Sequence, residues 1–147
     1  MNPELVGRAL PPTAPYLVGR EKVREFARAV FADAPQHSDS AAARALGYAD
    51  VVAPPTFAMV VQDLTLQQLL GDPDSGIELS RLVHAEQRFR YSRPIVAGDE
   101  LTATLSVTGI RTLGGNAMIT SEAEIVDADG AHVVTTTSVL LAGEAGA

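Results

Sequence analysis

The stretch APPTFAMVVQDLTLQQLL, residues 53–70, decides the fold of this chain. Proline is tolerated in the first turn of a helix, where amides have no intrahelical acceptor, so the stretch predicts a helix that begins near Pro55. Apolar side chains lie around most of its circumference and Asp63 is its only charged residue, which indicates a helix buried on nearly all sides. Gly71 and Pro73 predict its end.

The composition limits the classes of function. The chain has 147 residues, which we interpret as a single domain, 1–147, with 46% hydrophobic and 20% charged residues. It has no cysteine, which excludes disulfides, thiolate metal sites and cysteine nucleophiles. A formal net charge of −7 gives no indication of a nucleic-acid-binding face. The chain lacks an apolar leader and a membrane-length apolar run, so we expect a cytoplasmic protein.

Helical periodicity also occurs before the central stretch. Residues 20–31 place apolar side chains at helical spacing, with charged residues opposite, and predict an amphipathic helix. Residues 33–38 contain Pro35 and are typical of a loop. Asp39 or Ser40 then predicts the start of a short alanine-rich helix that runs to Leu46.

The period changes to that of strands after residue 76. Val83, Ala85, Gln87, Phe89 and Tyr91 alternate with polar residues and are predicted to face inward. Strands are also predicted at 101–108, 117–126 and 132–142, which with short turns give an antiparallel meander. Helices followed by a meander predict an α+β domain whose sheet wraps the central helix. The alternative is a cone-shaped α+β sheet with an internal pocket, which would require more aromatic residues than the 5% present.

Few side chains are available for acid/base chemistry. Of the three histidines, His84 and His132 lie at polar strand positions typical of the surface. His37 differs, because it lies in a loop between two helices and follows Asp33 by four residues. The residues alone leave two interpretations open, an exposed loop histidine and a catalytic one.

Three segments carry a family resemblance. They are Asp33-Ala34-Pro35-Gln36-His37, Val52-Ala53-Pro54-Pro55-Thr56-Phe57, and 87–94 followed by Ala97-Gly98-Asp99. Together with 20–27 they resemble the MaoC-like dehydratases and (R)-specific enoyl hydratases of the hot-dog fold. The similarity runs from about Tyr16 to Ala142 and is strongest to the actinobacterial branch, the small subunits of (3R)-hydroxyacyl-carrier-protein dehydratases with a FAS1-like dehydratase domain.

The resemblance implies a site, although the match is partial. Catalytic members carry Asp, any residue, Asn, Pro, an aliphatic residue and His. Alignment on Pro35 matches His37 to the family histidine, whereas Asp33 lies one position too close and Ala32 occupies the place of the aspartate. At the start of the central helix the hydratases carry a His-Gly pair whose glycine amide supports the thioester carbonyl. This chain has prolines there, which leaves later amides, at Thr56 or Phe57, to polarise a carbonyl.

Three functions follow from the resemblance as hypotheses. The first is a hydro-lyase in fatty-acid metabolism that acts on a (3R)-3-hydroxyacyl thioester, with His37 as base and Asp33 as proton donor. The second is a non-catalytic partner whose central helix lines the acyl channel of a dimer. The third is an acyl thioesterase, which would need a carboxylate on the central helix such as Asp63.

The resemblance also implies binding partners. The substrate is the acyl thioester of coenzyme A or an acyl carrier protein, and no cofactor or metal is expected. Arg88, Arg90 and Arg93 are candidates to meet the phosphates of the phosphopantetheine arm. Pairing of hot-dog sheets edge to edge implies a homodimer, or a heterodimer with another hot-dog subunit.

Overall fold

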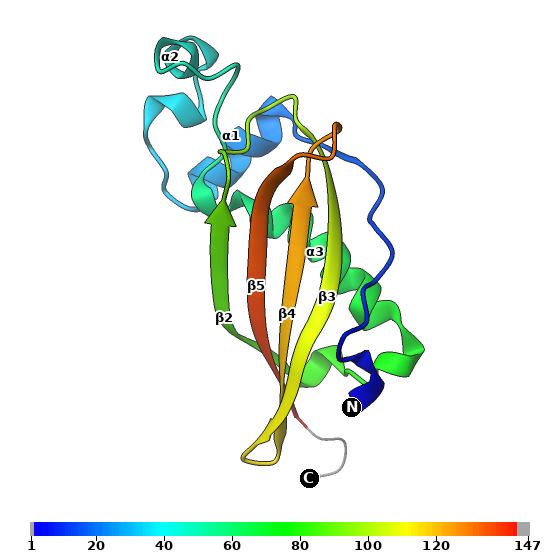
Figure 1. Ribbon diagram of the computed structural model, residues 1–147. Coiled ribbons are helices and arrows are strands. Elements are labelled where there is room, and N and C mark those ends of the chain that lie inside the picture. The colour runs from blue at the N-terminus through cyan, green and yellow to red at the C-terminus, as the bar shows by residue number, and fades with distance from the viewer. Residues whose placement is uncertain (1, 144–147) are drawn as a thin grey trace.

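The stretch that begins at Pro55 forms a 3₁₀ turn, Pro55–Phe57, which runs directly into helix α3, Ala58–Gly71. In the computed structural model, which describes residues 2–143, a curled five-stranded sheet wraps around this helix (Figure 1). The α+β fold with a sheet around a central helix is therefore confirmed. No helix in the described range is long and apolar enough to cross a membrane.

The burial of α3 differs from the prediction. Its buried residues form one stripe at helical spacing, namely Ala58, Val61, Gln62, Thr65 and Leu69. The prediction that nearly all sides are buried is wrong for the single chain, because the sheet curls around one side only. Met59, Val60, Leu64, Leu66 and Leu70 are half-buried, and Asp63 is exposed.

Two shorter helices precede α3 and lie beyond one end of the strands (Figure 1). Helix α1, Arg20–Ala29, begins where predicted and buries Val23 and Ala27. It ends before Phe31, whose side chain is 85% exposed, so the prediction that Phe31 faces the core is wrong. A 3₁₀ turn, Pro35–His37, leads to helix α2, Ser40–Ala45, where the side chain of Asp39 accepts a hydrogen bond from the amide of Ala41.

The sheet contains five antiparallel strands in the order β1-β3-β4-β5-β2. These are β1 (Tyr16–Leu17), β2 (Leu82–Tyr91), β3 (Glu100–Leu113), β4 (Asn116–Val126) and β5 (His132–Gly143). A simple meander is therefore wrong, since β2 pairs with β5 rather than β3. The strands β2 and β3 are not neighbours in the sheet, so the connection between them crosses from one edge strand to an inner strand. This connection pairs with the segment before α3, since the amide of Ala53 donates to Ile95 and that of Ala97 donates to Val51.

A β-bulge between His84 and Glu86 changes which residues of β2 face inward. An extra residue in one strand shifts the alternation beyond it by one. Val83 and Ala85, predicted to face inward, are exposed, whereas Phe89 and Tyr91 are half-buried and pack against the core.

The segment before β1 runs along β3 and extends the core. Two 3₁₀ turns, Pro3–Leu5 near the start and Pro73–Ser75 after α3, lie at this end of the helix, and a third, Leu79–Arg81, precedes β2. Leu5 and Leu10 are buried in a cluster with Leu69 of α3 and Leu105 of β3. The amide of Leu10 donates to the carbonyl of Leu105 at 2.8 Å, so this segment is anchored to the sheet.

Candidate functional site

A cavity of about 510 Å³ lies beside the start of the central helix. Its polar lining comes from Gln36, His37, Ser92 and Arg93. The rest of its wall is apolar or aromatic, and includes Tyr48, Val52, Ala53, Pro55, Tyr91 and Ile95. Such a cavity, mainly apolar with a few polar groups, is typical of a small-molecule site.

The backbone around Val52 fixes the position of His37. The amide of Val52 donates to the carbonyl of Gln36 at 2.9 Å, and Nδ1 of His37 lies 2.6 Å from the carbonyl oxygen of Val52. Because a carbonyl only accepts, Nδ1 carries the proton and Nε2 of the neutral ring keeps its lone pair. His37 is half-buried and lines the cavity, and Nε2 is the basic nitrogen of its neutral ring.

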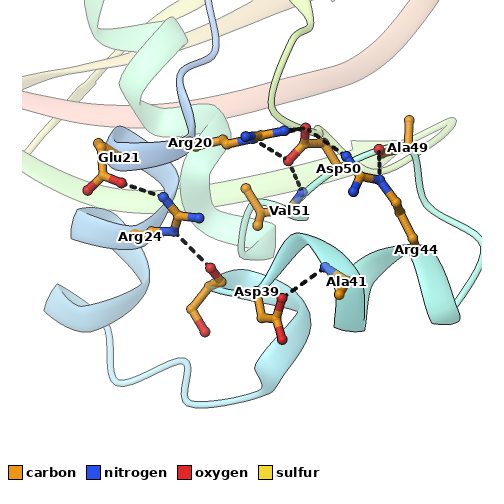
Figure 2. A network of polar contacts seen from close by, with 10 residues as sticks. Arg20, Glu21, Arg24, Asp39, Ala41, Arg44, Ala49, Asp50 and Val51 are labelled. Carbon is orange, nitrogen blue, oxygen red and sulfur yellow. Dashed lines mark hydrogen bonds and ion pairs between the residues drawn. The ribbon is translucent and has the colours of Figure 1, made fainter.

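A polar network holds the segment 38–50, which directly follows His37, against α1 (Figure 2). Arg20 of α1 forms a bidentate contact with Asp50, at 2.9 Å and 2.7 Å, and Arg24 donates to the carbonyl of Ser38 at 2.8 Å. The hydrogen bond from Arg20, together with that from the amide of Val51, lowers the pKa of the Asp50 carboxyl to about 2. The network therefore ties both ends of the segment 38–50 to helix α1.

Tyr91 and Pro55 lie in the wall of the cavity and contact each other. The hydroxyl of Tyr91 donates to the carbonyl of Pro55, and Tyr91 stacks on Phe89 with ring centroids 6.4 Å apart. Burial raises the pKa of Tyr91 to about 12, so this hydroxyl keeps its proton at neutral pH. Sequence reasoning missed the role of Tyr91 in the wall, and its position at the end of β2 beside Pro94 was the available signal.

Arg93 lines the cavity, but carboxylates already engage its guanidinium. It donates to both oxygens of Asp99, at 2.8 Å and 3.1 Å, and to Asp127 at 3.2 Å. These hydrogen bonds, that to Asp99 first, raise the pKa of Arg93. Arg93 therefore anchors the turn after β2 to the β4–β5 hairpin.

The other predicted site residues lie in different places. Asp33 is exposed and is not part of the cavity lining. Arg88 and Arg90 are exposed on the sheet face opposite α3, where Arg88 pairs with Glu86. Their contact with a phosphate stays a prediction without support from the cavity geometry.

The two predicted amides at the helix start differ. The amide of Phe57 donates to the carbonyl of Pro54 at 2.9 Å, and the Phe57 ring is buried edge-on against Phe26. The amide of Thr56 donates to no backbone carbonyl in the described part of the chain. Thr56 lines a second hollow, also of about 510 Å³, together with residues of α3 and β2. Thr56 is thus the amide available at this end of the helix.

The amino-acid sequence also matches a known protein family. Residues 4–136 match the FAS1-like, dehydratase domain region. The chain belongs to this family. Within residues 2–143, no group of His, Asp or Glu side chains is arranged to hold a metal ion.

Several related proteins align with nearly the whole chain. A UPF0336 protein of Clavibacter michiganensis is 66% identical over 141 residues, which is 96% of this chain and 95% of that protein. The structure resembles a chain of the HadBC (3R-hydroxyacyl-ACP dehydratase) complex from Mycobacterium tuberculosis, with a TM-score of 0.85, 31% identity, and 93% and 96% of the two chains covered. A MaoC-like dehydratase matches with a TM-score of 0.84 and 38% identity, over 95% of this chain and 42% of that one.

Proposed function

We propose that this protein is a (3R)-3-hydroxyacyl-thioester dehydratase or hydratase, or a subunit of one. The observation that carries the proposal is the imidazole of His37, held by Val52 so that its Nε2 is a free base in a mainly apolar cavity beside the start of the central helix. The similarity to a (3R)-hydroxyacyl-ACP dehydratase complex supports the same reaction class.

In the proposed dehydration, Nε2 of His37 removes a proton from C2 of the substrate. The C3–O bond then breaks, the hydroxyl takes a proton from an acid and leaves as water, and a C2=C3 double bond forms. Hydration is the reverse. We assign polarisation of the thioester carbonyl to the amide of Thr56 at the positive end of the helix. Thr56 lines the second hollow and not the cavity of His37, so the substrate must reach from one to the other past Pro55. Asp33 is the predicted acid, and its exposed position requires that the loop or a water molecule bring its proton to C3.

Two observations favour the second candidate, a non-catalytic acyl-binding partner. Asp33 lies outside the cavity lining, and Pro55, which lines it, has no N–H to donate. In a dimer of this kind a second hot-dog chain supplies the complete acid and base. No comparable observation favours a thioesterase, since Asp63 is exposed and accepts a hydrogen bond from Gln67.

The test is hydration of crotonyl-CoA and of a longer trans-2-enoyl-CoA by the purified chain, followed as loss of the enoyl absorbance. His37→Asn is the informative variant, because an asparagine amide can still donate to the carbonyl of Val52 while the base is lost. His132→Asn is the matched control, since it makes the same substitution at a histidine that does not line the cavity, and the asparagine amide can still contact Ser92 as Nδ1 of His132 does.

We expect activity in the wild type and the His132 variant, and a loss of about 100-fold or more with His37→Asn, as for removal of a general base. Equal activity in all three proteins would contradict a role for His37. Activity that appears only with a second hot-dog subunit, and that survives His37→Asn, would establish the partner function instead.

A further inference from the structure

The sheet face opposite α3 carries no helix in the described part of the chain (Figure 1). We call this surface, formed by β3, β4, β5 and β2, the outer face. Burial alternates along β4: Ser121, Ala123 and Ile125 are buried, whereas Glu122 and Glu124 between them are exposed. Glu122 and Glu124 therefore point toward the outer face. A broad, uncovered sheet face is a candidate interaction surface.

The strand register arranges the charges of the outer face in columns. Glu124 of β4 pairs with Thr135 of β5, which pairs with Arg90 of β2. Two residues further along, Glu122 pairs with Thr137, which pairs with Arg88. The outer face therefore has two acidic residues on β4, Glu122 and Glu124, and two basic residues on β2, Arg88 and Arg90, with threonines of β5 between them. We call these the acidic and the basic column; Glu86 precedes Arg88 on β2 and is ion-paired with it.

The same register places apolar side chains toward the other end of the outer face. Met118 of β4 pairs with Leu141 of β5, which pairs with Val83 of β2. Val83 is 59% exposed, and Met118 and Leu141 are half-buried. An apolar row thus follows the charged rows along the strands.

We propose that the outer face docks against the outer face of a second copy of this chain. A two-fold contact needs one surface that is complementary to itself. If the axis runs along β5, parallel to the strands, rotation places β4 of one copy over β2 of the other. Glu124 then faces Arg90 of the second copy, and Met118 faces Val83 of the second copy. The pattern is self-complementary in charge and in apolar character.

The register also excludes the perpendicular arrangement. An axis that runs across the strands would place β4 over β4, so that the acidic column faces itself and the basic column faces itself. Like charges held opposite each other are unfavourable. The charge pattern therefore selects one of the two ways in which the sheets can stack.

Side-chain length and existing contacts agree with this docking. Sheets that stack face to face lie about 10 Å apart, a gap that a glutamate and an arginine can span together. A hollow of about 510 Å³ is lined by Glu122, Glu124, Thr135 and Arg90 and extends to Thr104 and Ser106 of β3, and side chains of a second copy can enter it. Arg90 contacts Thr135 at 3.5 Å and pairs with no carboxylate within residues 2–143, whereas Arg88 already pairs with Glu86.

A charge swap tests the proposal better than a salt titration. Two copies with a net charge of −7 repel each other as a whole, so salt weakens both this repulsion and the local attraction. We would measure the mass of the assembly by sedimentation velocity for the wild type and for Glu122→Arg with Glu124→Arg. The compensated protein adds Arg88→Glu and Arg90→Glu. The control, Glu4→Arg with Glu25→Arg, makes the same charge change on exposed residues elsewhere.

We expect the double variant to have half the mass of the wild type, the compensated protein to recover the full mass, and the control to match the wild type. Restoration by the compensated protein separates the charge pairing from misfolding. A double variant with the wild-type mass, or a compensated protein with half of it, would overturn the proposal and leave the outer face to another partner or to solvent.

Because the chain has no cysteine, single cysteines provide an independent test. Thr137→Cys places a thiol on β5, beside the proposed axis, and a short bis-maleimide should join it to the same residue of the second copy. Leu46→Cys is the matched control, since Leu46 is 61% exposed after α2 and away from the sheet. Equal yields of crosslinked dimer from the two variants would contradict the docking.

Discussion

The tautomer of His37 is the residue-scale feature on which the proposed chemistry depends. Since the carbonyl of Val52 accepts at 2.6 Å, the neutral ring is expected to carry its proton on Nδ1. Long-range ¹H–¹⁵N correlation spectra of ¹⁵N-histidine-labelled protein above pH 8, where histidine is neutral, report which nitrogen is protonated. A proton on Nε2 would mean that His37 cannot act as the base in the geometry that we describe.

Two side chains of β5 form a matched pair for stability. Ser138 donates to Gln87 at 2.6 Å and lies 2.5 Å from Nε2 of the buried Gln62, whereas the hydroxyl of Thr136 is buried without a partner in the described structure. Ser138→Ala should lower the free energy of unfolding by about 1–3 kcal/mol, because the buried amide of Gln62 and the half-buried amide of Gln87 each lose a hydrogen-bond partner. Thr136→Val should raise it by about 1 kcal/mol, since it removes an unsatisfied polar group.

Urea unfolding of both variants measures these changes against the wild type. A Thr136→Val variant that is less stable by a similar amount to Ser138→Ala would show that its hydroxyl has a partner, such as bound water.

At this scale, the sequence predicted the histidine of the site but little of its surroundings. His37 was identifiable from its loop position and the family resemblance. The exposure of Asp33 and the free amide of Thr56 depend on backbone geometry that residue spacing does not determine. Arg93 is bound by Asp99 and by Asp127, and Asp127 lies 34 residues further along the chain. This contact therefore depends on the tertiary structure.

The end of helix α1 explains why its predicted length was wrong. The amide of Ala32 donates to Ala27 at 2.9 Å and that of Phe31 to Arg28 at 3.3 Å, the two hydrogen bonds of a Schellman motif. Phe31 occupies the left-handed position of this motif, with φ of 58°, where glycine or asparagine is usual. The stop signal is absent from the sequence, since a phenylalanine fills that position.

Phe31→Asn should therefore stabilise the protein by up to about 1 kcal/mol, because asparagine tolerates left-handed backbone angles better. The matched control is Val30→Asn, at an adjacent exposed residue with φ of −103°. Thermal and urea unfolding measure both. A loss of stability with Phe31→Asn would indicate that the exposed ring makes a stabilising contact.

The ion pair between Arg20 and Asp50 makes the attachment of the segment 38–50 to α1 dependent on pH. The pKa of Asp50 is about 2 in the folded protein, below the ordinary 3.8. A lowered folded pKa contributes stability that is present above the unfolded value and is lost as the pH falls from 3.8 through about 2. Arg20→Met should return the carboxyl pKa toward 3.8, as measured by ¹³C NMR titration. An unchanged titration would contradict the assignment to Arg20.

The order of the elements was predictable from periodicity, whereas the pairing of the strands was not. The changes between helical and alternating patterns placed α3 and the four long strands. The bulge in β2 and its pairing with β5 arise from contacts between distant segments, which local patterns do not specify.

For the whole molecule, the described part of a single chain leaves one strand edge and one flank of the central helix uncovered, in addition to the outer face. Within residues 2–143, β2 pairs only with β5, so its other edge is free. Among the same residues, half-buried Met59, Leu64 and Leu70 of α3 belong to neither core cluster. We predict that the free edge and this flank of α3 form one interface, the edge-to-edge pairing of hot-dog chains, and that the outer face forms another.

If so, Leu64→Glu should halve the mass of the assembly, because it places a charge in the first interface without opening the core. Glu122→Arg with Glu124→Arg should halve it through the outer face, and the three substitutions together should yield the monomer. Circular dichroism shows whether each variant is folded, and sedimentation velocity gives the masses. Independent interfaces contribute separately, so the combined variant should be lighter than both Leu64→Glu and the Glu122→Arg, Glu124→Arg variant. If its mass equals that of one of them, the surface changed only in the other does not form an interface.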